Sequence, residues 1–452
     1  MFKGIFDQTK PDSWGGHGRV SETVSVVLAL LALPGAALAQ EAVRPAHAIS
    51  STASLSSSTS VTGVLSLSKA IAIAMESNPE VAAATRQYEA TEGQVIQGRT
   101  RPNPELAYSL EDTRSQTRTQ TWQLNLPIEL GGKRAARTKA AEKAREQAQA
   151  ELTELKATVR ANVVAAYFDA LTAKERLSLA KDSIDLAKSS TDTVSKRVSA
   201  GKVSPVEETK AKVAEAGVRV ELAQAVSEER NALTRLSALL GNTGMPLPAL
   251  DGKADVLPVL PSLADLQSLV SASPAIARAR LEVERRHALT ELEQSKKVPD
   301  VTVSVGVQRS NETQRNVALI GLSVPLPMFD RNQGNLLEAL KLEDKAREDL
   351  QAAIVRLHSE VTQARERSAS IAVEVQSLER EVLPGAKSAY DAATVGFENG
   401  KFNFLEVLDA QRTYLSAKSQ YLKALAEAHR AASDVDRLLG GVTPAGQAST
   451  LN

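Results

Sequence analysis

Two pairs of short segments alternate apolar and polar residues with the period of two that is typical of β-strands. Leu106, Tyr108 and Leu110 alternate with more polar neighbours, and the pattern resumes over residues 121–128. A second pair covers residues 301–307 and 318–326, and the two strands of each pair are joined by a polar loop, at 112–118 and at 309–315. We expect two β-hairpins with strands of about nine to eleven residues, which is near the length that crosses a membrane. A soluble, half-buried sheet has the same alternation and stays open as the alternative.

Longer segments repeat apolar or small residues every three or four positions, as helices in coiled coils do. The longest can run from residue 133 to about residue 199, which is of order 100 Å. A second covers residues 350–382, and Pro384 is expected to bend it or to break its hydrogen bonding locally. A shorter helix is expected before each strand pair, at 68–98 and 263–296, because Pro102 and Pro299 follow.

Each long helix leads to a glycine that predicts the tip of a helical hairpin. Gly201 and Gly400 are each followed by a lysine and, after four further residues, by an acidic residue. Glycine accepts the left-handed backbone that ends a helix, and the segment after it can start the returning helix.

The chain is one design used twice, with an offset close to 200 residues. Matching pairs occur along both halves: Asn78-Pro79 with Ser273-Pro274, Leu126-Pro127 with Val324-Pro325, Gly201-Lys202 with Gly400-Lys401, and Leu239-Leu240-Gly241 with Leu438-Leu439-Gly440. We expect a signal peptide at 1–39, a flexible leader at 40–63, a first repeat at 64–241, a linker at 242–261, a second repeat at 262–441 and a C-terminal tail at 442–452.

The first forty residues have the pattern of an export signal. Lys3, Lys10 and Arg19 precede an apolar run at 24–33, and small residues at 37–39 form a cleavage site before Gln40. A membrane anchor is the alternative, but the run is too short for a span. The chain has no cysteine, which excludes disulfides, thiolate metal sites, a cysteine nucleophile and a lipid-anchored mature N-terminus.

Composition argues against several classes of function. Basic and acidic residues number 54 each, so we expect no nucleic-acid partner. The motifs of phosphate loops, nucleophile elbows and zinc proteases are missing from the sequence, so we expect no enzyme and no cofactor. We also expect no metal site, because no two histidines have the spacing of a ligand pair; the five are His17, His47, His287, His358 and His429.

Four strands are too few to close a barrel in lipid, where open sheet edges are not tolerated. The chain is therefore expected to oligomerise. Two copies would give eight strands and three would give twelve, and only the larger number leaves an open lumen.

The two tips, the doubled strand hairpins, and residues 381–390 and 404–411 are similar to the TolC family of outer membrane efflux ducts, over almost the whole mature chain. The resemblance implies a mainly α-helical fold with membrane β-structure. A trimeric outer membrane β-barrel, with four strands per chain, would continue into a long periplasmic α-helical barrel. The implied partners are outer membrane lipid, two further copies in a homotrimer, a periplasmic adaptor (membrane fusion) protein and a proton-driven inner membrane pump of the resistance-nodulation-division (RND) type.

Residues 126–134 and 101–106 resemble a narrower branch, which works with heavy-metal efflux pumps of the cobalt-zinc-cadmium and nickel-cobalt systems. That resemblance implies export of divalent nickel, cobalt, cadmium and zinc for metal resistance. Two alternatives stay open: a duct of the same fold for drugs or for type I protein secretion, and a periplasmic adaptor or scaffold with no pore.

The resemblance also implies two sets of functional residues. Glu406 and Asp409, spaced by three on one helix face, match the acidic ring that constricts the periplasmic entrance, and three copies would bring six carboxylates together. The alternative is a solvated helix face. The residues expected to dock the adaptor are those of the tips, for which simple helix capping is the alternative: Gly201, Lys202, Pro205, Gly400, Lys401 and Phe402.

Overall fold

The computed structural model describes residues 64–242, 247–252, 255–399, 401–402 and 404–441. The chain divides into two units, residues 1–60 and 61–452, and all described residues belong to the second. The expected signal peptide, leader and C-terminal tail lie outside the described residues.

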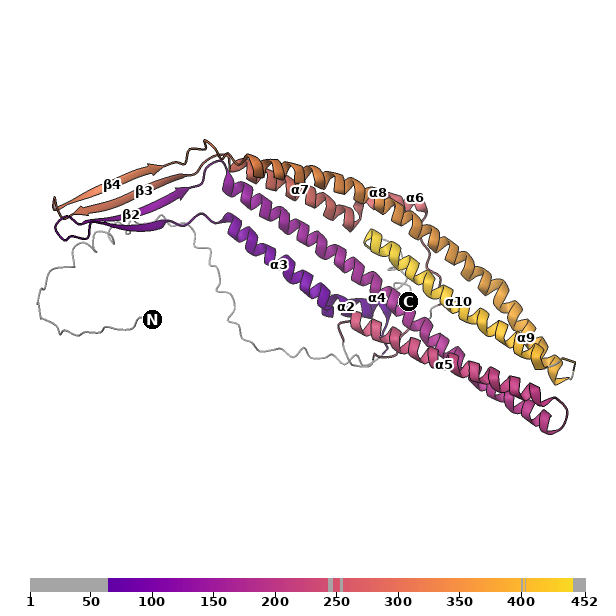
Figure 1. The fold of residues 1–452 in the computed structure, drawn as a ribbon. Helices are drawn as coiled ribbons and strands as arrows, with labels where there is room; N and C mark the ends of the chain where they lie inside the picture. Colours follow the sequence, from indigo (N-terminus) through magenta and orange to yellow (C-terminus); the bar gives the residue numbers. More distant parts are fainter. Residues whose placement is uncertain (1–63, 243–246, 253–254, 400, 403, 442–452) are drawn as a thin grey trace, which may run out of the picture. The chain divides into compact units, whose positions relative to one another are not determined.

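The same order of elements occurs twice along this unit (Figure 1). The first half contains α2 (Leu67–Ser77), α3 (Pro79–Arg99), β1 (Glu105–Glu111), β2 (Thr119–Ile128), α4 (Lys133–Ser199) and α5 (Pro205–Leu239). The second contains α6 (Leu263–Leu269), the 3-10 helix η1 (Val270–Ala272), α7 (Pro274–Ser295), β3 (Val301–Ser310), β4 (Arg315–Ser323), α8 (Gln333–Ser377), the π-helical turn η2 (Leu378–Val382), α9 (Leu383–Glu398) and α10 (Phe404–Leu439).

The expectation of one continuous opening helix in each half was wrong, because each is interrupted before a proline. Proline lacks an N–H group and is favoured at the first position of a new helix. Asn78 caps α3 by accepting hydrogen bonds from the backbone N–H groups of Glu80 (2.9 Å) and Val81 (3.2 Å). Ser273 caps α7 in the same way, accepting from Ile276 at 3.3 Å.

The prediction of a helix over residues 133–199 is confirmed, since α4 spans those 67 residues. Its buried positions include Val159, Val163, Ala166 and Ala170, which recur every three or four residues within one apolar cluster. The predicted disturbance at Pro384 is also confirmed. The turn before it is π-helical, and the N–H group of Leu383 reaches back five residues to the carbonyl of Leu378.

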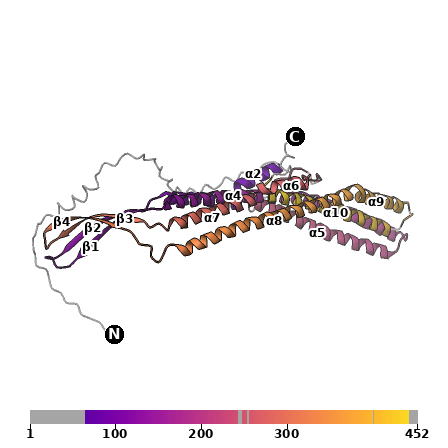
Figure 2. The same cartoon turned by 90° about the horizontal axis from the view of Figure 1, so that it is seen from above.

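The four strands lie together at one end of the unit (Figure 2) and form one antiparallel sheet in the order β1-β2-β3-β4. Cross-strand partners share a face of a sheet, and Leu106, Leu124, Val305 and Ile320 are successive partners. Leu106, Val305 and Ile320 are exposed, up to 86% for Ile320, and Leu124 is partly buried. A soluble half-buried sheet would cover such a face, so the structure does not fit that alternative.

The opposite face of the sheet is more polar. Asn125 pairs with Ser304, and the Ser304 hydroxyl donates a hydrogen bond to the Asn125 side-chain oxygen at 2.7 Å. The sheet is therefore apolar on one side and mainly polar on the other, as a wall between lipid and water requires.

Three strand boundaries of the second hairpin differ from the expected ones. The strand β4 ends at Ser323 and not at residue 326, because Pro325 and Pro327 have no N–H group for a regular ladder. The loop between β3 and β4 is shorter than expected, since β3 continues to Ser310 and β4 starts at Arg315. The predicted loop at 112–118 is confirmed.

No helix in the described part of the chain is long and apolar enough to cross a membrane. In the first half, Tyr167 on α4 contacts the linker at residues 242–261. The single hydrogen of its hydroxyl is shared between the carbonyl oxygens of Leu65 (2.8 Å) and Asp251 (2.6 Å), and Leu65 pairs with Leu250 in a parallel bridge. Burial raises the pKa of Tyr167 to about 12, so this group stays protonated and can donate.

We expect Tyr167→Phe to lower the free energy of unfolding by about 0.5–1.5 kcal/mol, because the hydrogen bonding of the buried hydroxyl to the linker is lost. The measurement is thermal unfolding of the purified protein in detergent. Tyr108→Phe, at a half-exposed ring of the sheet, is the control and should leave the midpoint unchanged. Equal midpoints for Tyr167→Phe and the parent protein would contradict the assigned role.

Candidate functional site

The first hairpin tip joins α4 to α5 and is closed as the sequence predicts. Gly201 has a φ of +68°, its N–H group binds the Val198 carbonyl at 2.9 Å, and the N–H group of Lys202 binds the Arg197 carbonyl at 2.9 Å. This pair of bonds is the helix-ending motif that favours glycine. Ser204 then caps α5, whose first residue is Pro205. Gly201, Lys202 and Pro205 are all exposed.

The second tip follows α9, and Gly400 lies outside the described residues. The N–H groups of Lys401 and Phe402 both point to the carbonyl oxygen of Gly396, at 2.8 and 3.2 Å. The Phe402 ring lies against Gly396 so closely that a Cβ atom there would be 2.2 Å from it. Gly396 is therefore the glycine whose missing side chain seats Phe402, a role that sequence analysis did not assign.

The two hairpins contact each other just before their tips. The Arg197 guanidinium carbon lies 4.0 Å from the centre of the Phe397 ring, and one guanidinium nitrogen is 3.5 Å from the Phe397 carbonyl oxygen. Such a cation–π contact is attractive within about 6 Å. Val194, Ala211 and Val407 pack in the same apolar cluster as Phe397. Arg197 and Phe397, which are 200 positions apart, thus connect the two repeats near the hairpin tips.

Both predicted gate residues lie on α10, the returning helix of the second hairpin. Glu406 and Asp409 are exposed and three positions apart, so they share a helix face. Whether their carboxylates meet those of other copies is decided by the assembly, and the constriction stays a prediction.

In the first hairpin, the acidic residues at the corresponding positions are less exposed than Glu406 and Asp409. Glu207 is half-buried, and its neighbour Glu208 binds Lys212 at 2.6 Å and accepts a hydrogen bond from Ser195 at 3.0 Å. The Lys212 ammonium, followed by the Ser195 hydroxyl, holds the pKa of Glu208 below its usual range. This carboxylate is used for packing within one hairpin, which is consistent with the second hairpin supplying the gate.

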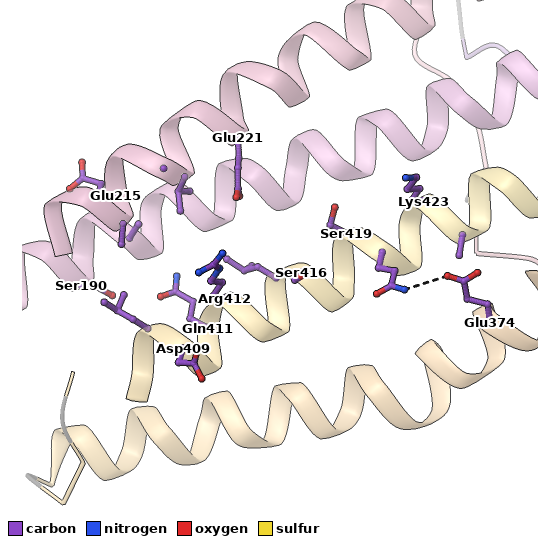
Figure 3. Close-up of a pocket in the computed structure, with 18 of the residues that line it drawn as sticks. Ser190, Glu215, Glu221, Glu374, Asp409, Gln411, Arg412, Ser416, Ser419 and Lys423 are labelled. Carbon is purple, nitrogen blue, oxygen red and sulfur yellow. Dashed lines mark hydrogen bonds between the residues drawn. The ribbon is translucent and has the colours of Figure 1, made fainter. Parts of the chain in front are cut away.

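Asp409 opens onto a groove of about 1290 Å³ between the hairpins. Figure 3 shows Asp409, Arg412, Ser416, Ser419 and Lys423 along α10, with other wall residues coming from α4, α5 and α8. Hydroxyl, amide and charged groups make up much of its surface. It therefore has the character of a wetted channel wall and lacks that of an apolar ligand pocket.

Negative charge exceeds positive charge in this groove. Five acidic residues line it against three basic ones: Glu215, Glu221, Glu374, Asp409 and Glu427 against Arg367, Arg412 and Lys423. Some are neutralised locally, since Arg367 binds Glu427 at 2.8 Å and Glu215 binds Arg219 at 2.8 Å. The remaining excess favours the passage of cations over anions. The groove was not found from the sequence, because its walls come from four helices in both halves.

Of the three described histidines, His287 and His429 contact neighbouring side chains and His358 is exposed. His429 stacks on Phe168 with ring centres 3.5 Å apart. The two ring nitrogens of His287 face different carboxylates, Glu343 at 3.1 Å and Glu291 at 3.4 Å. A metal site needs several ligands that converge on one point, and within the described ranges no group of three acidic, histidine or cysteine side chains could hold an ion.

Comparisons with known proteins agree with one another. The profile of a family described as outer membrane efflux protein matches residues 70–242 and 266–441. The chain is similar to the cobalt-zinc-cadmium resistance protein CzcC of Cupriavidus metallidurans, with 45% identity over 378 residues, which cover 84% of this chain and 90% of that protein. It is also similar to the nickel-cobalt-cadmium resistance protein NccC of Alcaligenes xylosoxydans xylosoxydans, with 28% identity over 50% of this chain and 51% of that one.

Among solved structures, the channel-forming protein CusC superimposes with a TM-score of 0.70. The match covers 83% of this chain and 92% of CusC at 19% identity. At that identity the likeness concerns the fold alone.

We expect Arg197→Gln to loosen the joint between the hairpins. A cation–π contact contributes about 0.5–2 kcal/mol, so amide hydrogens next to Gly201 should exchange about 2- to 30-fold faster. Hydrogen exchange followed by mass spectrometry measures this change. The neighbouring exposed Lys196, changed to Gln, is the matched control and should have no effect. Equal exchange in the two variants would mean that the Arg197 contact does not hold the tips.

Proposed function

Because the chain belongs to the outer membrane efflux protein family, we propose that it is the duct of a tripartite efflux system that exports divalent heavy-metal cations. The protein has a TolC-like fold and is located in the outer membrane. Similarity to CzcC along most of both chains carries the proposal, since that name includes cobalt, zinc and cadmium. The name of NccC adds nickel to the candidate substrates.

Three copies of the chain would form the duct. Each copy would supply its four strands to a closed sheet of twelve, with the apolar face toward lipid and the more polar face toward water. The exposed apolar side chains of β1 and β4 support this arrangement, because they are costly in water and favourable in a bilayer.

The entrance would lie at the hairpin tips. Glu406 and Asp409 from three copies would form the acidic constriction, and the groove beside Asp409 would continue the cation-favouring wall. Passage needs attraction without tight coordination, because a strongly bound ion leaves slowly. The lack of a metal-ligand cluster in the described part of the chain is compatible with such a role.

The partners in this system would be a periplasmic adaptor and a proton-driven inner membrane pump of the RND type. The adaptor would dock on the exposed tip residues Gly201, Lys202, Pro205, Lys401 and Phe402, and on Gly400. The pump would supply the energy and select the metal. No catalytic chemistry is assigned to the duct.

Growth of a strain lacking the gene, with and without complementation, tests the substrate class. We expect sensitivity to some of nickel, cobalt, cadmium and zinc, and unchanged tolerance of hydrophobic drugs. Sensitivity to drugs alone would leave a duct of the same fold and overturn the metal substrate. Recovery of a soluble periplasmic monomer would instead favour a scaffold without a pore.

The gate can be tested in the same assay. The double change Glu406→Gln and Asp409→Asn should lower metal resistance at normal protein levels, because the constriction loses the charge that draws cations in. Asp391→Asn, an exposed carboxylate of α9 that pairs with Lys387, is the control. Full resistance in the double variant would show that these residues are only a solvated helix face.

Replacement of Gly201 tests docking at the tip. Gly201→Trp should abolish resistance while the assembled protein stays at its normal level, since nothing within the chain lies within 4 Å of a Cβ atom at this position and the strain of a side chain at φ +68° costs about 1–2 kcal/mol. Gly201→Asn is the matched control, because asparagine tolerates the positive φ at a small cost. Loss of the assembly itself in Gly201→Trp would mean that the residue is structural.

A further inference from the structure

The sheet ends in two open edges. In the described chain β1 pairs only with β2 and β4 only with β3, so each edge strand keeps one row of backbone N–H and C=O groups without a strand partner. In a bilayer, groups of this kind must be paired within protein. An edge partner is therefore required, and the internal repeat indicates how it pairs.

The two hairpins have the same register. Glu105 pairs with Asn125, and the equivalent pair is Thr302 with Ser323. First strands are thus related by 197 residues and second strands by 198. Prolines next to the strands obey the same two offsets, since Pro102 corresponds to Pro299 and Pro127 to Pro325.

The joint between the hairpins is the pairing of β2 with β3, in which Asn125 lies opposite Ser304. The equivalent pairing on the other side of each hairpin follows when 198 is added to the number of the first partner and 197 is subtracted from that of the second. Asn125 becomes Ser323, at the end of β4, and Ser304 becomes Ala107, in β1. Because β1 belongs to the other edge of the sheet, this joint can only form with another copy.

We propose that β4 of one copy pairs with β1 of a second copy in the register that repeats β2 with β3, so that Ser323 lies opposite Ala107 of the second copy. The proposal rests on the assembly of several copies inferred above. In this register Leu322 lies opposite Tyr108 and Ile320 opposite Leu110, so apolar residues meet on the lipid-facing side.

The helices that continue from the strands favour the same register. Within one chain α4, which follows β2, packs against α7, which precedes β3. The equivalent pair between copies is α8 with α3. A slip of two residues keeps the faces of the sheet but moves the strands by about 6.8 Å, which is more than one helical turn of 5.4 Å. The contact between copies would then no longer repeat the contact within the chain.

The loop after β4 carries exposed apolar side chains that suit a contact with a second copy. Within the chain, the shorter loop after β2 is held by Asp300, which accepts from the N–H group of Leu130 (3.1 Å) and from Lys133 (2.7 Å). The residue equivalent to Asp300 at the joint between copies is Asn103, which lacks the charge. The loop after β4 exposes apolar side chains there instead: Leu326 by 77%, Met328 by 67% and Phe329 by 90%. They would cover the exposed Pro102 and Pro104 of the second copy.

Cysteine cross-linking tests the register directly, because the chain has no cysteine of its own. Partners across an antiparallel pair have Cα atoms about 4.5–5.5 Å apart, within the range for a disulfide, and diagonal neighbours about 7–8 Å apart are outside it. We expect Ser323→Cys with Ala107→Cys to form linked multimers on oxidation. The matched controls, Ser323→Cys with Glu105→Cys or with Ser109→Cys, shift the pair by two residues and should link several-fold less.

Each outcome of this experiment decides between the proposals. Multimers that link best through a shifted pair, or through none of the pairs, would overturn the register and leave the duct standing. A parent protein that forms no multimers in outer membrane extracts would overturn the assembly and the inference together.

A second variant tests the loop. Phe329→Ser removes a side chain that is 90% exposed within one chain, so the fold of the chain should not change. We expect the multimer to dissociate at a lower temperature in detergent. Val259→Ser, at an equally apolar and 83% exposed position of the linker, is the control. Equal dissociation temperatures for Phe329→Ser and the parent would show that the loop does not cover the second copy.

Discussion

The unpaired backbone groups along β1 and β4 are the constraint on which the rest of this structure depends. A chain with only four strands cannot satisfy both sheet edges in lipid by itself, so its sheet is complete only in an assembly. The exposed apolar face seen around Ile320, the more polar face around Asn125 and the repeat of one hairpin as a second all follow from this requirement. Such features belong to one segment of a larger closed sheet, and a monomeric protein that buries its own apolar residues would lack them.

The helices continue this design by using small side chains and polar contacts between the halves. Alanine and valine positions on α4 allow close packing over 67 residues without a thick apolar core. Farther along, Phe168 stacks on His429, and Asp169 binds Arg430 at 2.8 Å, so α4 and α10 are joined across the repeat. The contact of Arg197 with Phe397 adds a second joint near the tips. If one hairpin moves, these contacts must therefore either break or move the other hairpin with it.

Selectivity in such a duct is a matter of charge on a wetted wall. The groove beside Asp409 presents more carboxylates than basic groups, and several of these are already paired with neighbours. His287 faces carboxylates and His429 stacks on Phe168, and no group of three possible metal ligands occurs in the described part of the chain. The wall can attract a divalent cation without holding it, as rapid passage requires.

The sequence by itself determined the elements whose signals are local. Alternation of residue types located the strands, the three-four spacing placed α4 at the correct residues, and Gly201 marked the first tip. It could not show that Asn78 and Ser273 end helices, because capping competes with helix continuation by small energies. Only the tertiary structure decided which distant residues meet: Arg197 with Phe397, Phe168 with His429, and the four helices around Asp409. The physical reason is that periodicity fixes which face of an element is buried, whereas the partner of that face is selected by packing across about 200 residues of chain.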